Sequence, residues 1–210
     1  MNSEWKKIMK SIKYLIVISF TFLVTINIQG REKLIPFEYG DFMGYKNNKG
    51  EIVLPAKYRM AEKFSKYGIA AVVDDSSWAY IDTKGNVVIR PCSWDNFPDE
   101  FCDGLARFKK DEMFGFFNRK GEIVITNKFS YCSRFSNGLA AFCDGCKKQY
   151  IGEYDFYKGG KWGYINTKGK IVIEPIYEEA YDFEKGKAIV KLDSVWYYIN
   201  KNGKVIKKVK

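Results

Sequence analysis

The residues of this chain that could do chemistry are few, and a missing residue type limits them further. Cys143 and Cys146 form a C-x-x-C motif around the turn pair Asp144-Gly145. The 210 residues contain no histidine, which excludes Ser-His and Cys-His nucleophile pairs and any His-ligated metal site. It also removes the side chain used most often as a general acid or base near neutral pH. We therefore expect a protein that is not an enzyme.

The cysteines predict a local disulfide rather than a metal site. A single C-x-x-C motif is a weak metal signal, because zinc needs four ligands and no second such motif is present. We expect no metal and no cofactor. In an exported chain, Cys143 and Cys146 are better explained as a disulfide. Cys132 takes the place that alanine holds in related segments, which indicates a small buried residue.

Adjacent carboxylates offer an alternative. The pairs Asp99-Glu100 and Glu178-Glu179 are the kind of residue that a hydrolase acting on an envelope polymer would use. Neighbours in an extended strand point to opposite faces, and neither pair recurs with a partner. A deep cleft with two carboxylates roughly 5 to 10 Å apart would favour this hydrolase alternative.

The composition fits one packed domain with a basic surface. Hydrophobic residues make up 46% of the chain and aromatic residues 17%, which is enough for a core. The formal net charge is +10, and residues 31–210 hold 31 basic and 24 acidic side chains, a net +7. This excess weakly favours anionic partners, although Lys-rich solvated turns also explain it. We expect no specific nucleic-acid partner.

The first thirty residues predict export. A lysine-bearing start precedes an apolar run from Tyr14 to Ile28. As a helix this run spans about 22 Å, short of a bilayer core of about 30 Å. Residues 1–30 therefore resemble a signal peptide, or an N-terminal apolar helix that anchors the chain if it is not cleaved. Residues 31–210 are expected in the periplasm, on the cell surface or secreted, with membrane contact only through residues 1–30.

A phrase of about 35 residues recurs along the rest of the chain. Asn or Asp lies three residues before its turn glycine, and Tyr or Phe lies five residues before it. Trp, Phe or Met lies seven residues before it. The glycines are Gly50, Gly85, Gly121, Gly169 and Gly203, and the tryptophans are Trp78, Trp162 and Trp196. Such a fixed period is typical of a structural repeat.

Each copy is expected to form three short antiparallel strands. N-x-x-G between β-branched and aromatic residues predicts a hairpin, because Asn bonds its own backbone and Gly accepts a positive φ. The prolines Pro55, Pro91 and Pro175 are expected to end the second strand. A G-x-A segment then predicts a third strand. The repeat aromatics are expected to form the core, since one copy alone cannot bury its apolar face.

These residues resemble the bacterial WG (KWG) repeat family, whose pattern is W-G-[YF]-[IV]-[ND]-x-x-G-x-[IV]-[IV]-x-P. The fourth copy follows it closely, from Trp162 to Pro175, whereas Met43 and Phe114 replace Trp in two copies. The resemblance implies an all-β array that serves as an interaction module in exported proteins, and it supplies no catalytic residues.

The predicted domain covers residues 31–210. Copies lie near 42–74, 77–108, 113–142 and 161–191, with a partial copy at 195–210 and an insertion at 143–160. Ile35 and Phe37 precede Tyr45 by the same number of residues as Ala70 and Val72, in a predicted third strand, precede Tyr80. Residues 33–38 are therefore expected to form a strand of the same kind. They are expected to pair with the final hairpin, 195–206, and close a propeller-like ring; an open twisted array is the alternative.

Two surfaces are candidates for binding. The insertion carries Tyr150, Tyr154, Phe156 and Tyr157, either as a protruding partner surface or as a hairpin folded back on the array. Turn lysines Lys49, Lys84, Lys120 and Lys168 would form a basic rim if the copies stack in register. We therefore expect an exported, non-catalytic β-repeat module that binds a protein or an anionic envelope polymer. A purely structural envelope component is a further alternative.

Overall fold

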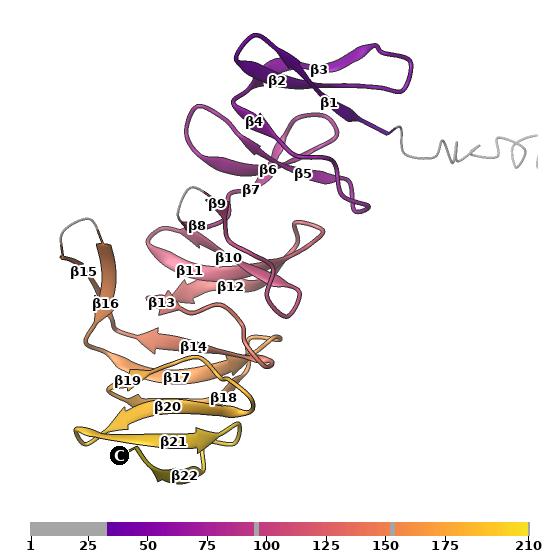
Figure 1. The fold of residues 1–210 in the computed structure, drawn as a ribbon. Coiled ribbons are helices and arrows are strands. Elements are labelled where there is room, and N and C mark those ends of the chain that lie inside the picture. The colour runs from indigo at the N-terminus through magenta and orange to yellow at the C-terminus, as the bar shows by residue number, and fades with distance from the viewer. Residues whose placement is uncertain (1–32, 95–96, 152–153, 210) are drawn as a thin grey trace, which may run out of the picture. The chain divides into compact units, whose positions relative to one another are not determined.

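The computed structural model describes residues 33–94, 97–151 and 154–209 (Figure 1). The chain divides into two units, Met1–Glu32 and Lys33–Lys210. The predicted signal peptide or anchor, residues 1–30, lies outside the described residues. The described regular structure is all β, and it contains no helix long and apolar enough to cross a membrane.

The described strands form small antiparallel sheets, and their members are as follows. The first sheet holds β1 (Ile35–Tyr39), β2 (Phe42–Lys46) and β3 (Ile52–Tyr58), and the second holds β4 (Met60–Ala61), β5 (Ile69–Val73), β6 (Trp78–Asp82) and β7 (Val87–Ile89). The third holds β10 (Leu105–Lys110), β11 (Met113–Asn118) and β12 (Ile123–Phe129). The fourth holds β13 (Tyr131–Cys132), β14 (Leu139–Asp144), β17 (Lys161–Asn166) and β18 (Ile171–Tyr177). The fifth holds β19 (Glu179–Ala180), β20 (Lys187–Leu192), β21 (Val195–Asn200) and β22 (Val205–Lys208). Two separate pairs are β8 (Ser93–Trp94) with β9 (Phe97–Pro98), and β15 (Lys147–Ile151) with β16 (Tyr154–Lys158).

The predicted N-x-x-G turns are confirmed. Between β17 and β18, the side-chain oxygen of Asn166 accepts the backbone N–H groups of Lys168 and Lys170 at 3.0 and 3.1 Å. The N–H of Gly169 donates to the carbonyl of Asn166 at 2.8 Å, and Gly169 has a φ of +74°. These bonds fix the turn locally, so each hairpin is specified by its own sequence.

The glycine of the W-G pair faces a bulge in the second hairpin strand. Trp162 pairs with Tyr177 but Tyr164 pairs with Ile173, so the three residues 162–164 of β17 lie opposite the five residues 173–177 of β18. A Cβ on Gly163 would lie 2.5 Å from the carbonyl oxygen of Ile173 and 2.8 Å from the nitrogen of Pro175. The same crowding occurs at Gly44 and Gly115. Glycine is needed here because the bulged backbone occupies the space of a side chain.

This bulge corrects the expected role of Pro55 and Pro175, whereas β7 ends at Ile89, before Pro91, as predicted. Pro55 and Pro175 lie inside β3 and β18, not at their ends. The bulge interrupts the ladder, so the missing N–H of proline costs no hydrogen bond there. In the last copy Tyr197 pairs with Lys208 and Tyr198 with Lys207 in plain register. Without a bulge opposite it, position 197 accepts tyrosine.

The copies share strands with their neighbours, which corrects the prediction of three strands within each copy. The third strand of a copy pairs with the next hairpin, as β5 pairs with β6 and β20 with β21. The second hairpin strand also runs on into the next sheet, since β3 pairs with β2 whereas β4, one residue later, pairs with β5. In Figure 1 the sheets therefore follow one another in chain order.

The prediction of a closed ring is wrong. β1 pairs with β2, with Pro36 opposite Tyr45, and β22 pairs with β21. In the described structure β1 does not pair with β21 or β22, the pairing that would have closed the ring. Residues 35–39 do form a strand at the predicted spacing from Tyr45, but it pairs with the adjacent hairpin. A two-residue turn at Gly40 and Asp41 connects β1 to β2. Closing this short loop costs much less conformational entropy than closing one that spans the whole domain.

In three copies the core is built on the aromatic residue that lies five positions before the turn glycine, whereas Tyr80 and Tyr198 at this position are half-buried. Tyr45, Phe116 and Tyr164 are fully buried, and the hydroxyls of Tyr45 and Tyr164 each donate to a backbone carbonyl at 2.7 Å. Trp78 is buried, but Trp162 and Trp196 are half-buried. The expectation that the tryptophans form the core therefore holds fully only for Trp78.

In the fifth sheet, lysine side chains lie over two aromatic rings. Lys191 Nζ lies 5.5 Å from the ring centre of Trp196, and Lys207 Nζ lies 5.3 Å from that of Tyr198. Lysine stems cover apolar surface while their ammonium groups stay in water. The rings of Trp196 and Tyr198 in the fifth sheet are covered in this way.

The bulge generates a prediction. Gly163→Ala should lower the free energy of unfolding by about 2–3 kcal/mol, because the new Cβ overlaps the backbone of β18. Urea unfolding would measure it. Gly138→Ala is the control, because its φ is +83° but a Cβ there meets nothing within 4 Å; it should cost about 1 kcal/mol. Equal effects of the two substitutions would show that crowding at Gly163 is not the constraint.

Candidate binding groove beneath the inserted hairpin

A disulfide closes the base of the inserted hairpin. The structure joins Cys143, at the end of β14, to Cys146, just before β15. A Cβ on Gly160 would lie 2.8 Å from the Cys143 sulfur and would also overlap the carbonyl oxygen of Asp144. Glycine therefore lets the returning chain pass the disulfide before it enters β17. Figure 1 shows the hairpin β15–β16 projecting from the array.

The four predicted partner-surface residues are divided between two environments. Tyr150 is 70% exposed. Tyr157 is half-buried, and its ring centre lies 4.5 Å from that of Tyr131 and 5.6 Å from that of Phe114. Phe156 is also half-buried, and the side chain of Tyr154 lies outside the described part. The hairpin therefore packs back on the array through β16 and presents Tyr150 of β15 to solvent.

A cavity of about 550 Å³ lies beside the hairpin, and we name it the hairpin groove. Its lining comprises five aromatic side chains, three cationic ones and three smaller residues. They are Phe114, Tyr131, Phe156, Tyr157 and Trp162; Arg107, Lys109 and Lys148; and Pro91, Cys92 and Ser93. None of these lining residues is acidic. Cationic groups between aromatic rings suit an anionic ligand that also has apolar surface.

A buried ion cluster fixes the deepest cation of the groove. Arg107 bonds Asp99 through Nε at 2.8 Å and through Nη2 at 3.0 Å, and its Nη1 donates to the carbonyl of Cys132 at 2.9 Å. Arg134 Nε lies 3.1 Å from Asp99, whose side chain is fully buried. Burial alone would lower the pKa of Arg107, but the bonds to Asp99 outweigh it and raise that pKa. Arg107 therefore stays charged at any physiological pH.

The other polar groups of the groove are held in defined states. Lys109 Nζ pairs with Glu112 at 2.6 Å. Burial works against its charge, but this bond raises the pKa of Lys109 above its ordinary value. Burial raises the pKa of Tyr131, and it raises the pKa of Cys92 to about 11. Cys92 is thus a thiol and not a nucleophilic thiolate near neutral pH.

Sequence reasoning missed Arg107, although a signal for it exists. Arg107 pairs with Phe116 at the strand position that Ala71 and Ala141 fill in neighbouring copies. An arginine at an interior position needs a buried acid, and Asp99 is that acid. Asp99 was considered only as half of a candidate catalytic pair. The structure places its carboxylate inside and that of Glu100 outside, 82% exposed.

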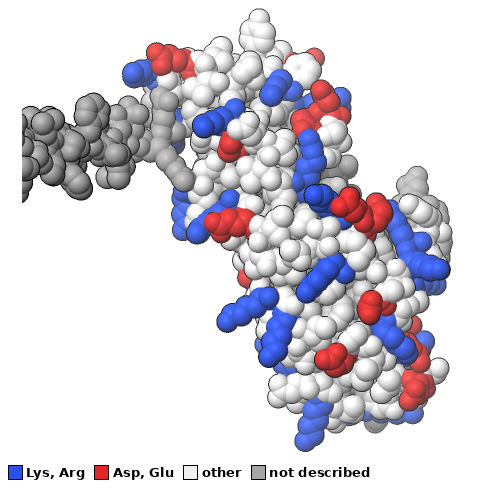
Figure 2. Space-filling view, turned by 180° about the vertical axis from the view of Figure 1, so that it is seen from behind, with Lys and Arg blue, Asp and Glu red and all other residues white. Residues whose placement is uncertain are grey.

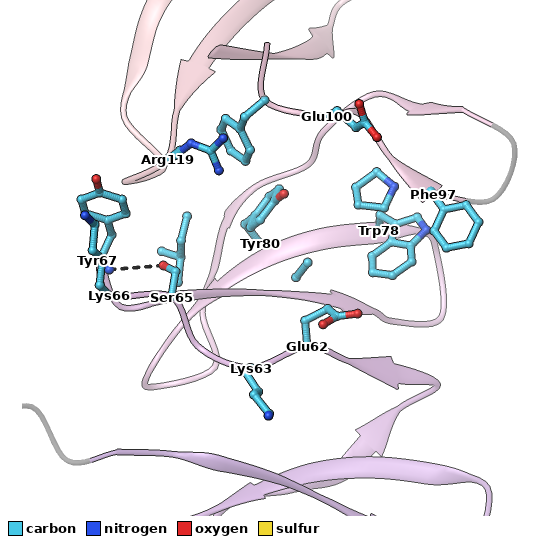
Figure 3. A pocket seen from close by; sticks show the side chains of 14 residues that line it. Glu62, Lys63, Ser65, Lys66, Tyr67, Trp78, Tyr80, Phe97, Glu100 and Arg119 are labelled. Atoms are coloured by element: carbon cyan, nitrogen blue, oxygen red, sulfur yellow. Dashed lines mark hydrogen bonds between the residues drawn. The ribbon is translucent and has the colours of Figure 1, made fainter. Parts of the chain in front are cut away.

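A second cavity, of about 790 Å³, lies between β5–β6 and the segment around Phe97 (Figure 3). Trp78 and Phe97 lie together on one side of it, and Arg119 stacks on Phe101 with its guanidinium carbon 4.8 Å from the ring centre. Glu62 and Glu100 both line this cavity and both are exposed.

The turn lysines are solvated. Lys49, Lys84, Lys120 and Lys168 are exposed, and the backbone N–H of each donates to the turn Asn or Asp. Figure 2 shows Lys and Arg interspersed with Asp and Glu over one face of the molecule. No group of three or more Cys, Asp or Glu side chains able to hold a metal ion occurs among the described residues.

Four consecutive segments match the profile of the WG containing repeat: residues 43–78, 78–113, 114–145 and 162–196. The chain belongs to the WG-repeat family. No curated protein matches it. In this WG-repeat chain the matches leave a gap at residues 146–161, and the hairpin β15–β16 lies within it. The hairpin is therefore an addition to the repeat pattern, whereas the sheets beneath it follow that pattern.

The ion cluster generates a prediction. Asp99→Asn should lower the free energy of unfolding by about 3–5 kcal/mol, because it leaves Arg107 charged and buried without a counterion. Glu100→Gln is the matched control, since Glu100 is adjacent and exposed, and it should change stability by less than about 0.5 kcal/mol. Thermal or urea unfolding of both variants provides the comparison. If Asp99→Asn is as stable as the parent, the cluster does not hold this part of the fold together.

Proposed function

We propose that this WG-repeat protein is exported and acts as a non-catalytic binding module, with the hairpin groove as its binding site. One observation carries the proposal: the disulfide-closed hairpin lies outside the repeat pattern, yet it forms one wall of a cavity. A repeat that needed only to stack would gain nothing from this addition. Binding residues are commonly carried on loops that a rigid scaffold positions, and here the sheets are that scaffold.

The lining of the hairpin groove supports an anionic ligand. Arg107, Lys109 and Lys148 line it, and no lining residue is acidic. Asp99 pairs with Arg107 from inside the fold, and exposed Glu112 pairs with Lys109. Exposed Tyr150 at the hairpin extends the aromatic surface beyond the groove. An acidic protein segment or an anionic polymer of the cell envelope has the matching chemistry.

Pull-down from envelope extract with the full-length protein tests the binding site. A double variant, Lys109→Gln with Lys148→Gln, should retain at least about tenfold less ligand than the parent, because it removes two of the three cations that line the groove. The control is Lys185→Gln with Lys187→Gln, which makes the same charge change at exposed positions of another copy. Equal losses in the two variants would show that overall charge, and not the groove, selects the ligand.

Export is tested separately. Cell fractionation should place the protein outside the cytoplasm, with a mature mass lower by about thirty residues if the leader is cleaved. A full-length product that is soluble in the cytoplasm would contradict export without bearing on the groove.

A further inference from the structure

Every copy exposes two aliphatic side chains directly after its turn. The ten residues that start the second hairpin strands are all Ile or Val, and each is between 39% and 65% exposed. They are Ile52 and Val53, Val87 and Val88, Ile123 and Val124, Ile171 and Val172, and Val205 and Ile206. They account for ten of the seventeen large hydrophobic residues exposed in the described part. Exposed apolar surface is thus concentrated at one position of the repeat.

The glycine contacts place these turns along one edge. A Cβ on Gly85 would meet the Leu54 side chain at 3.1 Å, and one on Gly169 would meet Ile125 at 3.1 Å. Gly121 and Gly203 lie in the same way against Val88 and Ile173. Each of the last four turns therefore lies against the second hairpin strand of the preceding copy. The exposed pairs follow one another from copy to copy at the turn ends of the strands, with the two members of a pair on opposite faces of their strand. We call this end of the array the turn edge.

The turn edge also carries most of the excess positive charge. The five seven-residue windows that start at Asn47, Asp82, Asn118, Asn166 and Asn200 contain eight Lys or Arg and three Asp or Glu, a net +5. Residues 31–210 together have a net charge of +7. The charge rises along the array, from zero in the first two windows to +1 in the third and +2 in each of the last two.

We propose that the turn edge docks on an anionic phospholipid bilayer. Aliphatic side chains that enter the headgroup region, bordered by lysines that pair with acidic lipids, are the chemistry of interfacial membrane binding. A charged polymer would gain from the lysines but not from the ten aliphatic side chains. A folded protein partner presents different local chemistry at each contact, whereas a bilayer presents the same chemistry to all five turns.

The hairpin groove lies at the other end of the strands. The hairpin β15–β16 precedes β17 at Lys161, and the turn follows it at Asn166. Six residues of strand separate the two by about 20 Å. A bilayer at the turn edge therefore leaves the hairpin groove open, and the two surfaces can be tested independently.

Lysine footprinting on vesicles tests which edge faces the lipid. The full-length chain is acetylated in solution and on vesicles of phosphatidylcholine with about one third phosphatidylglycerol, and modification is read by mass spectrometry. Lys168, Lys170, Lys201 and Lys204 of the turn edge should be protected by the vesicles. Exposed lysines at the hairpin end, Lys110, Lys147, Lys158 and Lys161, should remain reactive. If the protein binds but these four turn-edge lysines stay as reactive as in solution, residues 1–30 or another surface holds it and the proposal is overturned.

Partition measurements on the same full-length chain test the chemistry. Lys→Gln at Lys168, Lys170, Lys201 and Lys204 together should lower the vesicle partition coefficient at least about tenfold. Lys→Gln at the four hairpin-end lysines should change it less than about twofold. Ile123→Ser, Ile171→Ser and Val205→Ser together should also weaken binding. No binding to anionic vesicles, or equal losses in the two lysine variants, would overturn the proposal. Unchanged binding of the serine variant would indicate charge attraction alone and would equally overturn it.

Discussion

Three of the five copies depend on a close approach between two backbones, at Gly44, Gly115 and Gly163. Because Gly163 has no side chain, β18 can bulge toward β17 around Pro175 without a clash. Beyond the bulge the strand regains its pairing at Tyr177, and after Glu178 the chain joins the next sheet as β19. One missing Cβ thus permits the bulge, and the strand that bulges is also the one that joins successive sheets.

The bulge also limits unwanted pairing. β3, β12 and β18 each lie at the border of a sheet, where unpaired backbone groups could recruit another strand. A proline or an irregular register interrupts each of these borders. In the third copy Asn127 replaces proline, and its side-chain nitrogen donates to the carbonyl of Lys110 at 3.0 Å. β22 lacks the bulge, and its last residues are the lysines Lys207 and Lys208.

The local elements could be predicted from the sequence because their causes are local. The N-x-x-G turn, the hairpin and the positive φ of Gly169 follow from residues within a few positions of each other. The family and the all-β class follow from the period. The disulfide that the structure shows joins the two cysteines for which it was predicted, since Asp144-Gly145 brings them together.

Long-range features were harder to predict because equivalent partners compete. Several hairpins offer residues 33–38 the same pairing, and chain entropy selects the nearest one, which the spacing alone does not reveal. The hairpin groove depends on Arg107 and Asp99, which each occur in a single copy and so carry no periodic signal. A repeat pattern highlights what all copies share, whereas a binding site is formed by what one copy does differently.

The strand that joins successive sheets also determines how the domain comes apart. Since β3 and β4 are separated by one residue but belong to two sheets, the first sheet cannot open without pulling on the second. The same holds at β12 and β13, and again at β18 and β19, where one residue separates the partners. Because of this coupling, the free energy of interaction between neighbouring copies is large relative to the intrinsic stability of each copy. The array should therefore melt as one cooperative unit, and a cut within a joining strand should disturb both sheets that it serves.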